Sequence, residues 1–163
     1  RSRSIIAAST SQTAIGQTMG ADDHVVDSWI DEFREQYQAD ARNAARQTFE
    51  EYWGWVKSFL TEGGAGQRGW LQQGDDVLQK VGDAAAARDL RARVQDIGKA
   101  IAAEWAKHSR YRRIHSTMLQ GSPNLFDWGQ RLKRAAAEET GDGVSIGRAI
   151  DAIERDVRKA LRG

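Results

Sequence analysis

Basic and aromatic side chains are concentrated in residues 105–116, WAKHSRYRRIHS, and no acidic residue occurs between positions 105 and 126. If this segment is helical, Lys107, Arg110 and Arg113 fall on the face opposite its apolar stripe. Exposed cations on such a face suit contacts with nucleic-acid phosphates, each of which releases counterions. The alternative interpretation is a solvated helix face near a C-terminus, where basic residues are common anyway.

Cations outside residues 105–116 are also candidates for contacts with nucleic-acid phosphates. Arg131, Lys133 and Arg134 add positive charge in the next predicted helix, and 18 of the 24 basic residues are arginine, which favours bidentate phosphate contacts. We expect these side chains to bind nucleic-acid backbone without reading its sequence. The predicted nucleic-acid contacts are Arg1, Arg3, Lys107, Arg110, Arg112, Arg113, Arg131 and Arg134.

A glycine-rich stretch, GAGQRG at residues 64–69, matches the pattern GxGxxG. The dinucleotide-binding form of this pattern follows a strand and opens a helix, so that the pyrophosphate meets a helix N-terminus. Here a predicted helix precedes it, and the Gly-Lys-Ser/Thr of a P-loop is missing. We interpret this stretch as a loop.

Metal-binding and catalytic patterns are weak in this sequence. Residues 138–149 resemble a calcium loop, but Ala149 stands where the bidentate carboxylate is needed. His108 and His115 share one predicted helix, and no second helix supplies a matching Glu-x-x-His pair. The chain has no cysteine, which excludes a thiol nucleophile and a disulfide framework, and nothing points to a Ser-His-Asp arrangement. We expect no cofactor, no metal and no enzymatic activity.

The composition predicts an all-α fold. One proline in 163 residues, with abundant Ala, Gln, Glu and Arg, favours helices, and alternating β-branched runs are absent. A chain of this length buries enough surface to fold without disulfides or metals. No apolar run reaches the length of a membrane span, and no secretory signal is visible.

The domain organisation predicted is a polar N-terminal arm, residues 1–21, followed by an α-helical domain, residues 22–163. The arm holds seven Ser or Thr and no acidic residue. Such a segment has little means of ordering itself, so we expect it to lie against a neighbouring subunit or nucleic acid wherever it is ordered.

Long helices are predicted from the spacing of apolar residues. From Val26 to Phe59 they recur every three or four positions, which predicts one helix of about 55 Å or two nearly collinear ones. Gly54 and residues 38–40 are the expected breaks. Further helices are predicted at 70–81, from a cap at Asp83 along a stripe that reaches Met118, at 125–139, and from a cap at Ser145 to the C-terminus.

Six tryptophans are spread over several predicted helices. Most should lie in the core, because an indole buries a large area. Trp53, Gly54 and Trp55 point in different directions around a helix, so we expect one of these tryptophans to meet a partner or a neighbouring subunit.

A short pattern resembles a helical string in tobacco-mosaic-type rod coat proteins: Gln36-Tyr37-Gln38, then Ala41-Arg42, then Phe49-x-Glu51-x-Trp53. The expected architecture, a long-helix bundle with an extended arm, is also similar to that of coat proteins of filamentous archaeal viruses. Both resemblances imply a protomer of a helical nucleoprotein filament, located in a virion.

Two functions therefore stand open. The first is a non-enzymatic coat or capsid protomer that assembles with copies of itself or other chains and binds nucleic-acid backbone. The second is a helical-bundle adaptor or effector domain that binds a protein, in which case the basic face is only solubilising and a cytoplasmic location is expected.

Overall fold

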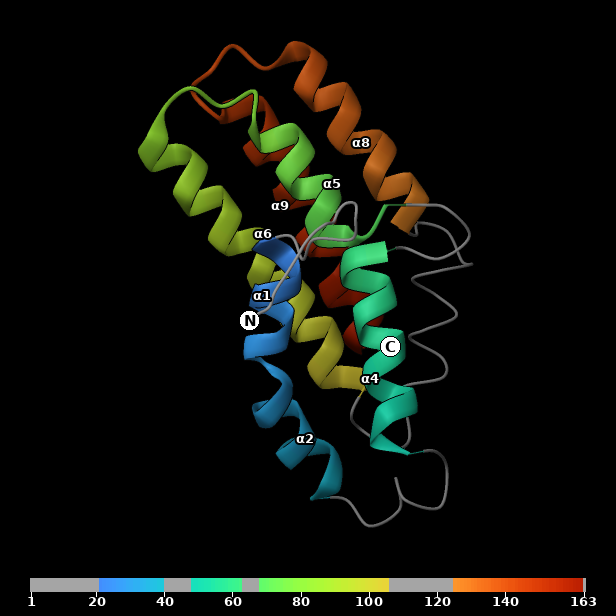
Figure 1. The fold of residues 1–163 in the computed structure, drawn as a ribbon. Helices are drawn as coiled ribbons and strands as arrows, with labels where there is room; N and C mark the ends of the chain where they lie inside the picture. The colour runs from blue at the N-terminus through green and yellow to red at the C-terminus, as the bar shows by residue number, and fades with distance from the viewer. Residues whose placement is uncertain (1–20, 40–47, 63–67, 106–124, 163) are drawn as a thin grey trace, which may run out of the picture.

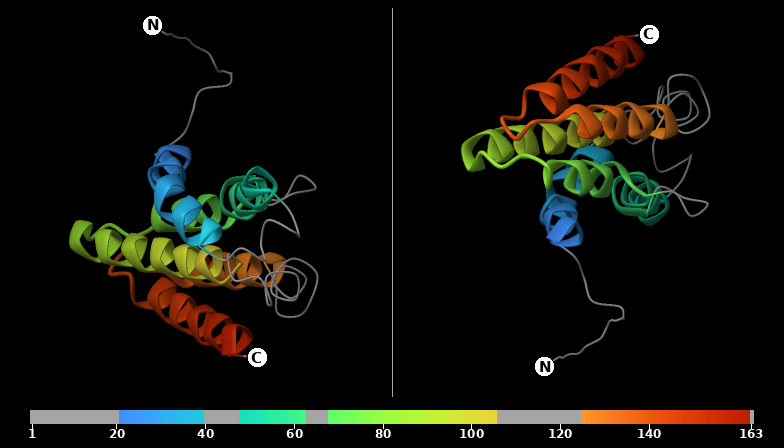
Figure 2. Two further views of the ribbon diagram at one scale, coloured as in Figure 1. Left: turned by 90° about the horizontal axis from the view of Figure 1, so that it is seen from below. Right: turned by 90° about the horizontal axis from the view of Figure 1, so that it is seen from above.

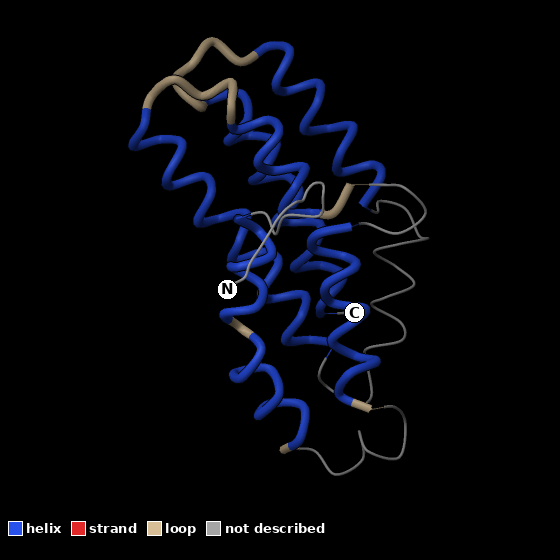
Figure 3. The backbone as a smooth tube through the Cα atoms, in the orientation of Figure 1, coloured by secondary structure: helices blue, strands red, loops and turns tan. Residues whose placement is uncertain are grey.

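The computed structural model describes residues 21–39, 48–62, 68–105 and 125–162. These residues form seven α-helices and one π-helix, and none of them forms a β-strand, which confirms the all-α prediction (Figures 1 and 3). The π-helix is Ser58–Glu62, which continues α4. In chain order the α-helices are α1 (Ala21–Ser28), α2 (Ile30–Gln38), α4 (Phe49–Lys57), α5 (Trp70–Leu78), α6 (Ala84–Trp105), α8 (Leu125–Glu138) and α9 (Val144–Arg162).

The helices are arranged in layers (Figure 2). α1, α2 and α4 lie on one side of the molecule, α6 and α8 lie in the middle, and α9 lies at the opposite edge. α5 packs against both α6 and α8, and α9 packs against the same two helices from the other side. One face of α9 is therefore turned away from the bundle.

The predicted long helix at the N-terminus is wrong. α2 and α4 lie side by side as the two arms of a hairpin, with the rings of Tyr37 and Tyr52 stacked at 4.8 Å and those of Phe33 and Trp53 6.0 Å apart. Of the two expected breaks, helix α2 does end near residues 38–40, whereas Gly54 lies inside α4. The apolar spacing was correct because each arm of the hairpin buries its own stripe.

The core is built around large aromatic side chains. Trp70 and Trp128 meet edge to face at 5.9 Å, and the Trp70 Nε1 donates a hydrogen bond to the Val94 carbonyl at 2.8 Å. Four of the six tryptophans are buried: Trp29, Trp53, Trp70 and Trp128. These four side chains are therefore core residues and not surface contacts for a partner. The side chains of Trp55 and Trp105 lie outside the described residues.

Helix α6 begins as predicted. The Asp83 carboxylate accepts hydrogen bonds from the backbone N–H groups of Ala85, at 2.9 Å, and Ala86, at 3.1 Å. These bonds satisfy two of the amides that a helix N-terminus leaves without partners. The predicted continuation of this helix toward Met118 lies outside the described residues.

Helix α9 begins differently from the prediction. Ser145 is not its cap, since the Ser145 Oγ donates to the Ala135 carbonyl of α8 at 2.9 Å. The amides at this helix start are bound instead by Asp142, which accepts from Val144 at 3.0 Å, and by Glu139. Two glycines with positive φ, at 141 and 143, allow the tight α8–α9 turn that brings Glu139 there.

The apolar stripe of α9 is confirmed: Ile146, Ile150, Ile153 and Val157 are buried, and Leu161 is partly buried against the same core. Among the described residues, no helix combines the length and the apolar character that crossing a membrane requires.

Candidate nucleic-acid interface

Most of the predicted nucleic-acid contacts cannot be placed. Arg1, Arg3, Lys107, Arg110, Arg112 and Arg113 lie outside the described residues, as does the predicted arm apart from Ala21. Arg131 and Arg134 both lie on α8, at the flank that faces α9. The candidate interface among the described residues therefore consists of residues of α8 and α9.

Arg131 is engaged within the fold. Its Nη1 lies 2.7 Å from the Oδ2 of Asp156 on α9, and the two side chains are 32% and 28% exposed. The structure therefore gives Arg131 a role in joining α8 to α9.

Arg134 differs from Arg131, although it lies less than one helical turn further along α8. The side chain of Arg134 is exposed and forms no ion pair with any described residue. Together with Arg148 of α9 it lines a groove of about 490 Å³, whose rim also carries Glu138 and Asp142. Arg134 and Arg148 thus offer cations on the two sides of one groove.

The acidic side chains of α9 are all held in ion pairs with arginines. Asp151 and Glu154 both bind Arg93 of α6, and Glu154 also binds Arg158, with 3.0 Å between oxygen and nitrogen. Hydrogen bonds from Arg158, and then from Arg93, hold the pKa of Glu154 below its ordinary value despite partial burial. With Asp156 bound to Arg131, no acidic residue of α9 is left without a cation.

The basic side chains on the far side of α9 remain exposed. Arg148, Arg155 and Lys159 stand at positions i, i+7 and i+11, so at 100° per residue they fall within about 20° of one direction. This direction is opposite to the buried isoleucine stripe. We call these three residues the outer face of α9. None of them forms an ion pair within the described part of the chain, and the face spans about 17 Å.

Sequence reasoning did not select the outer face of α9. Basic residues near a helix C-terminus are common in any case, because the helix dipole favours cations there. The i, i+7, i+11 spacing was visible, but the sequence could not show that Arg93 and Arg131 neutralise the acids between these cations. Those partners lie on α6 and α8, beyond the reach of spacing patterns within α9.

In the described residues, no group of three or more His, Asp or Glu side chains is placed to hold a metal ion. Comparisons with protein-family models, with curated proteins and with solved structures find no match to this chain. The resemblance to rod-shaped coat proteins stays a prediction. Its Gln36-Tyr37-Gln38 lies on α2 and its Phe49-x-Glu51-x-Trp53 on α4, whereas Ala41-Arg42 lies outside the described residues.

Proposed function

We propose that this chain is a non-enzymatic structural protein that binds nucleic-acid backbone without reading sequence, as a protomer of a helical nucleoprotein assembly. The observation that carries the proposal is the outer face of α9. Its three cations, Arg148, Arg155 and Lys159, are exposed while every acid on the same helix is paired with an arginine.

The length of the outer face fits a run of phosphates. A face of about 17 Å is long enough for its three cations to contact successive phosphates of one strand. Flexible Arg and Lys side chains on a helix surface contact such phosphates at variable positions, which fixes a strand without selecting bases.

The charges on the opposite side of the molecule also favour binding of the strand at α9. α1 and α2 together contain six acidic residues and one arginine, and they lie across the bundle from α9. Three of these acids are paired, Asp27 with Lys57, Asp31 with Arg34 and Glu32 with Lys99. Acids still outnumber these cations, so this side attracts an anionic strand less than the outer face of α9 does, particularly at low ionic strength.

A matched pair of variants tests the backbone-binding half of the proposal. Arg155→Gln with Lys159→Gln removes two cations from the outer face, and Lys80→Gln with Arg88→Gln removes one lysine and one arginine, also exposed and unpaired among the described residues, from α5–α6. Fluorescence anisotropy with three oligonucleotides of unrelated sequence should show a loss of about tenfold or more for the first variant only, equal for all three sequences. A loss shared by both variants would reject the outer face as the site.

The assembly half of the proposal is supported by the coat-protein resemblance and by the predicted polar arm. Size-exclusion chromatography with absorbance at 260 and 280 nm tests it directly. We expect a large species with excess absorbance at 260 nm. A monodisperse monomer that stays a monomer after nucleic acid is added would reject it.

The burial of four of the six tryptophans weakens one argument for both functions, because these side chains had suggested either a protein partner or a neighbouring subunit. The over-long helix, which had favoured assembly, is also absent. The pattern of free and paired charges on α9 is what now separates the two functions, and it favours a polyanion.

A further inference from the structure

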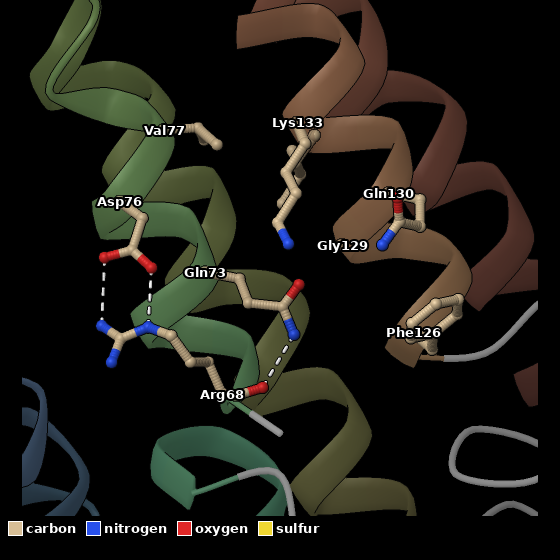
Figure 4. A pocket seen from close by; sticks show the side chains of 9 residues that line it. Arg68, Gln73, Asp76, Val77, Phe126, Gly129, Gln130 and Lys133 are labelled. Carbon is tan, nitrogen blue, oxygen red and sulfur yellow. Dashed lines mark hydrogen bonds and ion pairs between the residues drawn. The ribbon is translucent and has the colours of Figure 1, made fainter. Parts of the chain in front are cut away.

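A cleft of about 260 Å³ lies between α5 and α8 (Figure 4). Val77 of α5 and Leu132 of α8 are the buried apolar residues behind it. The two helices approach closely at Gly129, where an added Cβ would lie only 2.0 Å from the Gln73 Oε1. The volume is below the range of roughly 300–1,000 Å³ that holds drug-sized ligands, so it suits a smaller group.

An exposed aromatic ring stands beside this cleft. Phe126, at the start of α8, is 59% exposed, and only Val144 among the other large hydrophobic residues described is exposed as well. Leaving a phenyl ring in water forgoes the free energy that burial would provide. A ring in this position is therefore available to stack on a flat partner.

The charge in the cleft is positive. Arg68 and Asp76 neutralise each other through two hydrogen bonds, of 2.6 and 3.0 Å. Lys133 forms no ion pair among the described residues, and Figure 4 shows its amine in the space between α5 and α8. An anionic group is therefore the complementary ligand for Lys133.

Two amides complete the site. The Gln73 Nε2 donates to the Arg68 carbonyl at 2.7 Å, which leaves the Gln73 Oε1 as an acceptor. The Gln130 amide forms no hydrogen bond among the described residues and faces the same cleft. An aromatic face, an amine and side-chain amides together match a nucleotide: a flat base with polar edges, joined to a phosphate.

The cleft is connected to the outer face of α9 by adjacent residues of α8. Lys133 lines the cleft toward α5, and Arg134, the next residue, lines the groove toward α9 together with Arg148. A strand whose phosphates follow Arg155, Arg148 and Arg134 would therefore reach Lys133, which lines the same cleft as Phe126.

We propose that the cleft between α5 and α8 receives the base of an unpaired nucleotide from the strand held on α9, with the base stacked on Phe126 and a phosphate at Lys133. This inference rests on the proposed function and specifies its ligand. A base inside a duplex cannot present its face to Phe126, so the site requires a single-stranded nucleotide. Stacking on a phenyl ring tolerates all bases, in agreement with binding that does not depend on sequence.

The test compares a single-stranded oligonucleotide with an abasic strand of equal length and charge, by fluorescence anisotropy on the full chain. Wild type should bind the base-bearing strand about fivefold tighter or more, because one base–aromatic stack contributes that much. Phe126→Ala and Phe126→Leu should remove the difference, and Phe126→Tyr should keep it. Since Phe126 is largely exposed, thermal melts of these variants should overlay that of wild type.

The other outcomes separate this inference from the proposed function. Equal binding of the two strands by wild type would overturn the inference, would leave Phe126 as a contact for a protein partner, and would not affect the outer face of α9. A difference that survives Phe126→Ala would overturn it as well. In contrast, Arg155→Gln with Lys159→Gln should weaken both strands equally, and no weakening of either would reject the proposed function itself.

Discussion

The guanidinium of Arg131 on α8 and the carboxylate of Asp156 on α9 form an ion pair, with 2.7 Å between Nη1 and Oδ2. This pair joins two helices and neutralises the negative charge of Asp156, which lies next to Arg155 and near Lys159 in the sequence. Arg93 does the same from the other flank of α9, where it binds Asp151 and Glu154. Two arginines of the bundle thus make the exposed side of α9 cationic, although the chain as a whole carries a net charge of only +1.

Arg131 and Arg134 should therefore respond differently to substitution. Arg131→Gln breaks a half-buried pair, so we expect the free energy of unfolding in urea to fall by about 1 kcal/mol. Arg134→Gln, at an exposed and unpaired side chain, should stay within about 0.5 kcal/mol of wild type and should instead weaken nucleic-acid binding. Equal stability of the two variants would contradict the assignment.

The hydrogen bonds of the Asp83 cap of α6 should contribute to the free energy of unfolding. Asp83→Ala leaves the amides of Ala85 and Ala86 without their acceptor, which should lower the free energy of unfolding by about 1 kcal/mol. Asp83→Asn provides an equivalent acceptor and should retain most of the stability. If both variants unfold at the same urea concentration as wild type, the cap contributes nothing.

Two glycines should give opposite results when changed to alanine. Gly54 lies exposed inside α4, and an added Cβ would have no atom within 4 Å, so Gly54→Ala should stabilise the protein by roughly 0.5–1 kcal/mol. At Gly69 a Cβ would lie 2.4 Å from backbone atoms of Leu60 and Thr61, so Gly69→Ala should cost about 1–3 kcal/mol. Thermal unfolding of the two variants measures both signs, and a stabilised Gly69→Ala would be inconsistent with this packing.

Glu139 should make stability depend on pH. Its partial burial opposes ionisation, but hydrogen bonds from the N–H groups of Gly143, Ile146 and Gly141 outweigh that effect and hold its pKa below the ordinary value of 4.5. A lowered pKa in the folded state means that this stabilisation is present above pH 4.5 and is lost as the pH falls through the folded-state pKa.

Glu139→Gln should therefore be less stable than wild type near neutral pH and should lose less stability on acidification. Glu138→Gln is the matched control, because Glu138 is exposed and accepts no hydrogen bond within the described residues. The measurement is the melting temperature of wild type and both variants between about pH 3 and 7, the range in which carboxylates titrate. Parallel curves for wild type and Glu139→Gln would contradict this origin of the pH dependence.

The helices could be predicted from the sequence because they depend on local spacing. The stripe of Ile146, Ile150 and Ile153 and the cap at Asp83 were both correct, since periodicity and capping involve residues within a few positions of each other. The α2–α4 hairpin was missed because the apolar spacing continues unchanged through residues 39–48, which contain no proline or glycine.

The candidate site depended on contacts that local patterns do not contain. Arg131 was selected as a phosphate contact from its charge, and the structure pairs it with Asp156, 25 positions further along the chain. Ser145 was selected as a cap from its type, and the α8–α9 turn gives that role to Asp142 and Glu139. For Ser145 the residue type allowed two roles, and tertiary packing selected between them. For Arg131 the ion pair is a role that its charge alone did not reveal.

The salt dependence of nucleic-acid binding tests the central claim most directly. For wild type, Arg155→Gln with Lys159→Gln, and the control Lys80→Gln with Arg88→Gln, the logarithm of the binding constant is measured against the logarithm of salt concentration. The same measurement is made separately for a variant of the predicted basic segment, Lys107→Gln with Arg110→Gln and Arg113→Gln. Each lost phosphate contact reduces the slope by roughly 0.7–0.9, so the α9 variant should be shallower than wild type by about 1.4–1.8, and the control unchanged. An α9 variant with the slope of wild type would contradict the assignment of its outer face as the nucleic-acid interface.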